Sequence, residues 1–336
     1  MKSLAEGGAT LPVVVFFPEA RLHVVSGKGG TGKTTVAAAL ALALAEDGHR
    51  VLLCEVEGRQ GIAPLLDVPH LHHQERKVAR SSGGGEVDAL AIDPEEALIE
   101  YLEMFYRMGR AGRLLRRLGA IDFVTTIAPG LRDVLLIGKV KEAMVRRQGA
   151  GHVYDAVVVD APPTGRIVRF LGATDEVAQL AKVGPIRAQS ESVMATLRSA
   201  QTAIHLVTLL EEMPVQETVD GVTELHRAGL PVGAVFINKV SAPELSDEDM
   251  KLALARRLDL DEISAALQSI GLDAGPDVVK VLADEAAEHA RRVELQREEL
   301  VELEALDAPL LELPLLPSAH DLAGLRELAE EIRDQW

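Results

Sequence analysis

The sequence is poor in sulfur and in aromatic side chains. Its 336 residues include a single cysteine, Cys54, and aromatic residues make up 3% of the chain. One thiol cannot form an intramolecular disulfide, and it cannot supply the two or four thiolates of a metal cage. Because aromatic side chains are scarce, the core of a chain of this length has to be filled mainly by Leu, Val, Ile and Ala.

Long apolar runs and an excess of basic residues are also missing. No stretch of about 18 apolar residues occurs, so the sequence predicts no transmembrane helix. The apolar run 11–17 is short, contains Pro12 and is followed by Pro18, which does not fit a secretory signal. The formal net charge of −17 argues against binding to nucleic acid. We therefore expect a cytoplasmic protein without a nucleic-acid partner.

A glycine-rich loop stands between an apolar run, 22–25, and a helix-forming run, 36–44. It fits the pattern G-x-x-x-x-G-K-[ST], in which backbone N–H groups converge on phosphate oxygens. Lys33 should reach the β- and γ-phosphates of a nucleotide, and the Thr34 hydroxyl should bind Mg²⁺. The alternative is a glycine-rich turn that binds nothing. The predicted phosphate-binding residues are Gly27, Lys28, Gly29, Gly30, Thr31, Gly32, Lys33, Thr34 and Thr35.

Two further polar residues follow apolar runs that are typical of buried strands. Asp160 ends the run 154–160, where an aspartate that organises Mg²⁺ is expected beside a phosphate loop. A simple turn after the strand is the alternative. Asn238 follows the run 232–237, and its amide can both donate to and accept from an adenine edge. Asparagine also ends strands because it favours turns, so this second indication is weak alone.

The order of the elements predicts an α/β fold. Strands that alternate with helices indicate a mostly parallel sheet flanked by helices, as in a P-loop NTPase. We expect one domain, 1–336, with helical insertions at about 94–150 and 175–200 that form a lobe. A third helical and strongly charged segment is expected at about 246–305. The polar stretch 70–85, which contains three histidines, is predicted to be a surface loop.

Two of these motifs carry a resemblance to a known family. The run 28–35 resembles the deviant phosphate loop shared by arsenite-pump, septum-site, chromosome-partitioning and nitrogenase-iron-protein ATPases. The run 160–166, followed by Arg169, is similar to the second switch of the arsenite-pump ATPase (ArsA) family. That family includes the guided-entry ATPases, which deliver tail-anchored membrane proteins. The stretches 127–130, 211–218 and 313–317 also resemble family segments and occur in the same order along the chain as in the family. The last of them resembles a loop that packs on adenine.

The resemblance implies an ATPase with ATP and Mg²⁺ as cofactors. Lys33, Thr34 and Asp160 would then bind Mg-ATP, and Pro314 would contact adenine. Lys28 would cross a dimer interface to the phosphates of a partner, which would be an identical chain or a paralogous ATPase. Hydrolysis would drive a conformational switch that acts on a protein partner or a membrane-protein client.

The sequence departs from the family pattern at several places. Glu57 stands where the family has an aspartate that positions the attacking water, and Arg166 stands where a histidine is usual. The zinc-binding Cys-x-x-Cys and the arsenite-binding cysteines are absent, so neither a zinc nor an arsenite site is expected. Glu57 leaves open a nucleotide-binding regulatory subunit with weak turnover. The acidic C-terminal run 327–334 argues against a chromosome- or division-site-positioning ATPase.

The composition of the expected lobe bears on its client. Five arginines lie between positions 107 and 117, and the segment contains few methionines. A groove that shelters a transmembrane helix needs a long apolar floor, and methionine helps it to adapt. We therefore expect a protein partner rather than a naked transmembrane segment, bound near an apolar patch that includes 120–124 and 134–137. The alternative, which we favour for most of these residues, is that they pack the lobe onto the sheet.

Overall fold

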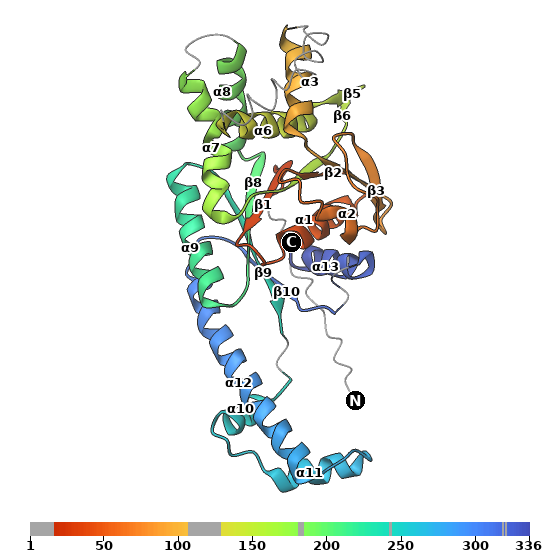
Figure 1. The fold of residues 1–336 in the computed structure, drawn as a ribbon, viewed down its shortest axis with the longest axis vertical. Helices are drawn as coiled ribbons and strands as arrows, with labels where there is room; N and C mark the ends of the chain where they lie inside the picture. The colour runs from red at the N-terminus through yellow and green to blue at the C-terminus, as the bar shows by residue number, and fades with distance from the viewer. Residues whose placement is uncertain (1–16, 107–128, 181–184, 242–243, 318, 320) are drawn as a thin grey trace, which may run out of the picture.

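The computed structural model describes residues 17–106, 129–180, 185–241, 244–317, 319 and 321–336 (Figure 1). The arginine-rich stretch 107–117 and the apolar stretch 120–124 lie outside the described residues. Of the stretch 134–137, Leu135, Leu136 and Ile137 are buried in the core, so they pack the lobe onto the sheet and form no exposed patch.

Eight strands of the described chain form one sheet in the order β10-β9-β8-β1-β7-β2-β4-β3. Neighbouring strands run parallel, except that the edge strand β3 is antiparallel to β4. The predicted α/β class with a mostly parallel sheet is therefore confirmed. The strands are β1 (Leu22–Gly27), β2 (Arg50–Glu55), β3 (Arg76–Arg80), β4 (Glu86–Ala91), β7 (Ala156–Asp160), β8 (Thr202–Thr208), β9 (Val232–Val240) and β10 (Leu310–Pro314).

Helices cover both faces of this sheet. The helices α1 and α13 pack together on one face, and α6, α7 and α9 lie on the other (Figure 1). The described helices are α1 (Lys33–Ala45), α2 (Ile62–Leu65), α3 (Pro94–Tyr106), α6 (Pro129–Val145), α7 (Thr164–Leu180), α8 (Pro185–Leu197), α9 (Glu212–Arg227), α10 (Asp247–Leu254), α11 (Leu260–Ser269), α12 (Pro276–Glu304) and α13 (Leu322–Gln335).

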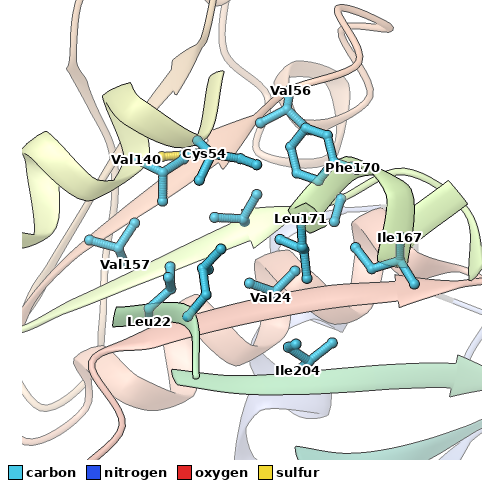
Figure 2. Packing of buried hydrophobic residues seen from close by; sticks show 14 of the residues in the cluster. Leu22, Val24, Cys54, Val56, Val140, Val157, Ile167, Phe170, Leu171 and Ile204 are labelled. Carbon is cyan, nitrogen blue, oxygen red and sulfur yellow. The ribbon is translucent and has the colours of Figure 1, made fainter. Parts of the chain in front are cut away.

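The central strands read as continuous apolar runs because both of their faces are buried. Every residue of β1 is buried, and its side chains alternate between the two faces of the sheet. Figure 2 shows one face, where Leu22 and Val24 of β1 lie beside Ile167 and Leu171 of α7. The core is aliphatic, as the composition indicates.

The register brings the polar ends of three strands to one edge of the sheet. Val25 of β1 pairs with Asp160 of β7, and Glu55 of β2 pairs with the same aspartate. On the other side of β1, Gly27 pairs with Val207 of β8. The loop that follows β1 therefore begins next to the carboxylate that ends β7.

Two helical projections leave the sheet at opposite ends (Figure 1). One, the helical lobe, comprises α3 and α8 together with α6 and α7, which also cover one face of the sheet. The other, which we call the arm, comprises α10, α11 and α12 within residues 244–304, and α12 also packs against α9. No helix in the described ranges is long and apolar enough to cross a bilayer.

The structure differs from the sequence prediction in two places. The stretch 70–85, predicted as a surface loop, contains the edge strand β3. Its run Arg76–Arg80 is mostly charged, so no apolar pattern marks it as a strand. The expected helical stretch 94–150 ends in a small hairpin of β5 (Arg147–Gln148) and β6 (Gly151–His152), a polar pair of strands too short to give a pattern.

Candidate functional site

The glycine-rich loop connects β1 to α1 and depends on glycine at two positions. Gly27 has φ of +153°, and a Cβ built on it would lie 2.2 Å from the backbone oxygen of Val207. Gly32 has φ of +91°, and its Cβ would lie 2.3 Å from Asn238 Nδ2. No described atom lies within 4 Å of a Cβ built on Gly29 or Gly30. The loop is thus packed at its ends and open in the middle, where a ligand can approach its backbone.

Lys33 begins α1 beneath this loop and is only 8% exposed. Its Nζ donates to the backbone oxygen of Lys28 at 3.3 Å and lies within 4 Å of no carboxylate in the described chain. Burial lowers the pKa of Lys33, although Asp160 and Glu57 act to raise it. A largely buried ammonium without a contacting carboxylate fits an anionic ligand such as a nucleotide phosphate.

Thr34 and Asp160 meet beside the lysine. The Thr34 hydroxyl donates to Asp160 Oδ2 at 2.7 Å. Burial raises the pKa of Asp160 to about 6, and the charges of Glu55 and Glu57 add to this effect, while Thr34 and Lys33 oppose it. A hydroxyl and a carboxylate oxygen are the donors that Mg²⁺ takes at a phosphate site. The pair therefore fits the metal that the sequence predicts there.

Glu57 lies on the loop after β2, and its side chain is 17% exposed. Its carboxylate is 3.5 Å from Arg59 Nη2 and 3.9 Å from Arg166 Nη1, near the start of α7. Because Glu57 also influences the pKa of Lys33, its charge lies near the phosphate site. The structure thus brings the predicted first-switch residue toward the predicted second switch. Its role in positioning water stays a prediction.

Glu55 is a buried carboxylate that the sequence prediction did not include. It is 2% exposed, Oε1 accepts from the backbone N–H of Gln60, and Oε2 accepts from that of Ile62 at 3.4 Å. The loop between them contains left-handed residues at Gly58 and Gln60. Glu55 therefore fixes the loop that carries Glu57. A glutamate at the end of an apolar strand, two positions before another glutamate, was the only signal in the sequence.

Lys28 projects from the phosphate loop toward α9. Its Nζ lies 3.0 Å from Glu217 Oε1, and both side chains are partly exposed. The lysine is thus paired within its own chain. Its predicted contact across a dimer interface stays a prediction.

The two residues predicted to contact adenine lie on adjoining segments. Asn238 is buried, its Nδ2 donates to Thr31 O at 2.8 Å, and its Oδ1 accepts from Lys239 N. It therefore braces the phosphate loop, a role that the sequence did not indicate. Pro314 ends β10, and the next residue, Leu315, donates its N–H to Val240 O at 2.9 Å. Contact of either side chain with adenine stays a prediction.

The second switch packs closely against α9. A Cβ built on Gly221 of α9 would lie 2.4 Å from Thr164 Cγ2 at the start of α7. The hydroxyl of Thr164 is buried without a hydrogen-bond partner in the described structure. The helix that carries the partner of Lys28 is therefore in direct contact with the segment that follows Asp160.

The histidines of the stretch 70–85 and Cys54 belong to no metal-binding group among the residues that the structure describes. Within the described ranges, no three His, Cys, Asp or Glu side chains are arranged to hold a metal ion. His73 is packed rather than solvated, since its Nδ1 accepts from Asp93 N and its Nε2 lies 3.2 Å from Glu100 Oε1. Cys54 is buried, and burial raises the pKa of its thiol.

Comparison with known proteins gives a consistent result. Residues 20–198 match the family model described as "Anion-transporting ATPase". The chain is 53% identical over 316 residues to ATPase BagA of Mycobacterium tuberculosis, covering 94% of this chain and 93% of that protein. It is 30% identical over 198 residues to ATPase GET3 of Kluyveromyces lactis, covering 56% and 55% of the two chains. It is also 24% identical over 310 residues to ATPase ARSA1 of Chlamydomonas reinhardtii, covering 75% and 38%.

Proposed function

The chain belongs to the anion-transporting ATPase family and is an ATPase, and we propose that its Mg²⁺-dependent hydrolysis drives a conformational switch between two ATPase subunits. The observation that carries the proposal is the group of Lys33, Thr34, Asp160 and Glu57 at one edge of the sheet. Glu57 is the one departure from the family pattern within this group, and it keeps a carboxylate at that position. The switch acts on a protein partner or a membrane-protein client.

Each residue of the group has a separate task toward the nucleotide. Lys33 neutralises charge on the β- and γ-phosphates, while the open middle of the loop donates backbone N–H groups. Thr34 and Asp160 hold Mg²⁺, which supplies further positive charge to the phosphates. Glu57 orients the attacking water, because phosphoryl transfer depends mainly on positioning.

The dimer is proposed from the position of Lys28. Its partner Glu217 is 38% exposed, so the ion pair is accessible and weak. When a second subunit approaches, Lys28 leaves Glu217 and reaches the phosphates bound by that subunit. There it stabilises the charge that develops in the transition state. The second subunit is an identical chain or a paralogous ATPase.

The lobe is proposed as the output surface. The second switch continues directly into α7, which packs against α6 and α8 of the lobe. Loss of the γ-phosphate near Asp160 can therefore move these helices together. Hydrogen exchange should detect the motion as a difference in protection of residues 129–145 between the ATP and ADP states.

A second candidate is a regulatory subunit with slow turnover. The observation that favours it concerns Glu57, whose side chain is longer than that of aspartate. Its carboxylate already pairs with two arginines, Arg59 and Arg166. A turnover assay on the pure chain separates it from the main proposal. Turnover of less than about one ATP per hour, with retained ATP binding, would favour the regulatory subunit.

Calorimetry and sedimentation test the site and the dimer together. Lys33→Ala should abolish Mg-ATP binding, whereas Lys28→Ala should retain most of the binding and lose turnover and ATP-promoted dimerisation. Lys251→Ala, on α10 of the arm, is the matched control and should leave ATP binding, turnover and dimerisation unchanged. Unaltered ATP affinity in Lys33→Ala would refute the site, and an active monomer under ATP would refute the dimer.

A further inference from the structure

A hollow separates the arm from the end of the sheet. It encloses about 1140 Å³ between α10, α11, α12 and the segments that follow β9 and β10. We call it the arm groove. It shares Pro314 and Leu315 with the predicted adenine loop, 313–317, but contains none of the phosphate-site residues.

We call the apolar residues of the arm that line the arm groove its floor. Its side chains come from α10, α11, α12 and the turns between them, and α11 contributes no fully buried residue. Leu252 and Leu282 remain 36% and 38% exposed. The arm thus holds an apolar surface that the described chain does not cover. The floor includes Leu245, Leu252, Leu258, Ile263, Ala266 and Leu282.

The charged residues that line the arm groove, which we call its rim, are mainly acidic. Six carboxylates line it, against two guanidinium groups, those of Arg257 and Arg292. Two of the carboxylates accept hydrogen bonds at helix starts. Asp249 accepts from the hydroxyl of Ser246, the N-cap of α10, and Asp259 is itself the N-cap of α11. The other four form no ion pair or side-chain hydrogen bond with the described chain, and they belong to Glu244, Glu262, Glu285 and Glu288.

The arm as a whole is acidic, like the rim of its groove. Residues 244–304 include seventeen acidic and seven basic side chains, so the arm carries more than half of the net charge of −17. A second copy of the arm would bring like charge to the groove, which disfavours self-association through this surface. The chain's own residues 1–16 contain one lysine and one glutamate, so they offer no basic edge.

We propose that the arm groove binds an amphipathic helix of another protein, with an apolar face toward the floor and basic residues toward the rim. An α-helix is about 10–12 Å in diameter, so this volume accommodates roughly seven to ten helical residues. Apolar contacts supply affinity, and the acidic rim selects a basic partner and its orientation. The proposal does not depend on ATP turnover or on the dimer.

A synthetic helix provides the test with the full-length protein. The probe is a fluorescein-labelled 14-residue Leu/Lys peptide whose leucines lie on one helix face, measured by fluorescence anisotropy. Two control peptides are a scrambled sequence of the same composition and a Leu/Glu version. The Leu/Lys helix should bind at least tenfold more tightly than either control, and its binding should weaken as salt rises from 50 to 300 mM.

Variants of the chain locate the binding. Ile263→Asp should weaken peptide binding at least tenfold, and it should fold because no residue of α11 is fully buried. The double variant Glu285→Lys with Glu288→Lys should weaken it by a similar factor. Val301→Asp, 65% exposed on α12 away from the groove, should change binding less than twofold.

Three results would overturn the proposal. They are equal binding of the scrambled peptide, unchanged binding by the groove variants, and an ATP-independent dimer that Ile263→Asp abolishes. The last result would assign the groove to a second copy of the chain. ATP turnover measured on the same samples distinguishes a failed groove from a failed ATPase site.

Discussion

Replacing Glu55 with glutamine tests whether this buried carboxylate positions the loop between β2 and α2, which carries Glu57, the residue proposed to orient water. Glu55 lies at the end of β2 and accepts the backbone N–H groups of Gln60 and Ile62. Glutamine has nearly the same shape, but one of its terminal oxygens becomes an NH₂ donor. That donor must face one of the two backbone N–H groups, so one hydrogen bond is lost.

The expected magnitude follows from the charge on the acceptor. A hydrogen bond to an ionised, buried group contributes about 1.5–3 kcal/mol. If the loop conformation seen here is stabilised by about 2 kcal/mol less free energy, its occupancy falls roughly 30-fold. Glu57 is carried by this loop, so turnover should fall about 10- to 100-fold. ATP affinity should change less than about threefold, because Glu55 makes no hydrogen bond to the phosphate loop.

A pH profile distinguishes this positioning role from general damage. The charge of Glu55 is one of the influences that hold the pKa of Asp160 at about 6. Removing that charge lowers the pKa of Asp160, so Asp160 remains ionised to lower pH. The acid limb of kcat/KM for Mg-ATP, which reports groups of the free enzyme, should therefore shift to lower pH in Glu55→Gln, and it should stay in place in Glu55→Asp, which keeps the charge.

Glu46→Gln is the matched control. The Glu46 carboxylate also accepts two backbone N–H groups, those of Ser82 and Gly83, but it lies at the other end of α1. The substitution should leave kcat and ATP affinity unchanged. Wild-type turnover in Glu55→Gln would contradict the positioning role. An equal loss of kcat and ATP affinity, with no shift of the acid limb, would indicate general damage instead.

Three further substitutions have defined outcomes. Gly32→Ala should weaken ATP binding at least tenfold by calorimetry, because the φ of Gly32 is +91° and a Cβ would lie 2.3 Å from the side-chain amide of Asn238. Gly130→Ala is the control, since a Cβ there meets open space, and it should leave ATP binding unchanged. Glu217→Gln should free Lys28 and increase ATP-promoted dimerisation about two- to fivefold in sedimentation, and an unchanged dimer would contradict the pairing within one chain. Burial lowers the pKa of His23 to about 4 from an unfolded value near 6.5. Stability is therefore lost as pH falls below 6.5, by about 2 kcal/mol between pH 7 and pH 5, and urea unfolding of His23→Gln should show a correspondingly smaller loss.

Local patterns in the sequence were sufficient to predict the sheet and to place Asp160 beside the glycine-rich loop. The central strands are buried on both faces, so apolar runs such as 51–54 and 156–159 mark them directly. In a parallel sheet the carboxyl ends of the strands meet at one edge. Asp160 could therefore be placed near the glycine-rich loop from its position at the end of an apolar run.

Features that depend on tertiary contact had no such pattern. β3 is stabilised by pairing with β4 at the sheet edge, so its charged residues gave no apolar alternation. The pairing of Lys28 with Glu217 depends on how α9 packs against the second switch. Asn238 was assigned to adenine from its type alone, whereas its hydrogen bond to Thr31 depends on the neighbouring strands. The arm groove exists because α10, α11 and α12 leave apolar side chains uncovered where they meet. No pattern within any one of these helices predicts that arrangement.

The contacts of Glu55 and Glu57 together indicate how the loop that carries Glu57 can be held at its base while its carboxylate changes partners. Glu55 is buried and bonded to backbone, so the base of the loop stays in place. Glu57 contacts Arg59 and Arg166 at 3.5 and 3.9 Å, and these arginines are 67% and 58% exposed. Such solvent-exposed pairs contribute about 1 kcal/mol or less. A bound γ-phosphate can therefore draw the arginines away from Glu57 at little cost, which frees the carboxylate for water while the loop beneath it remains held.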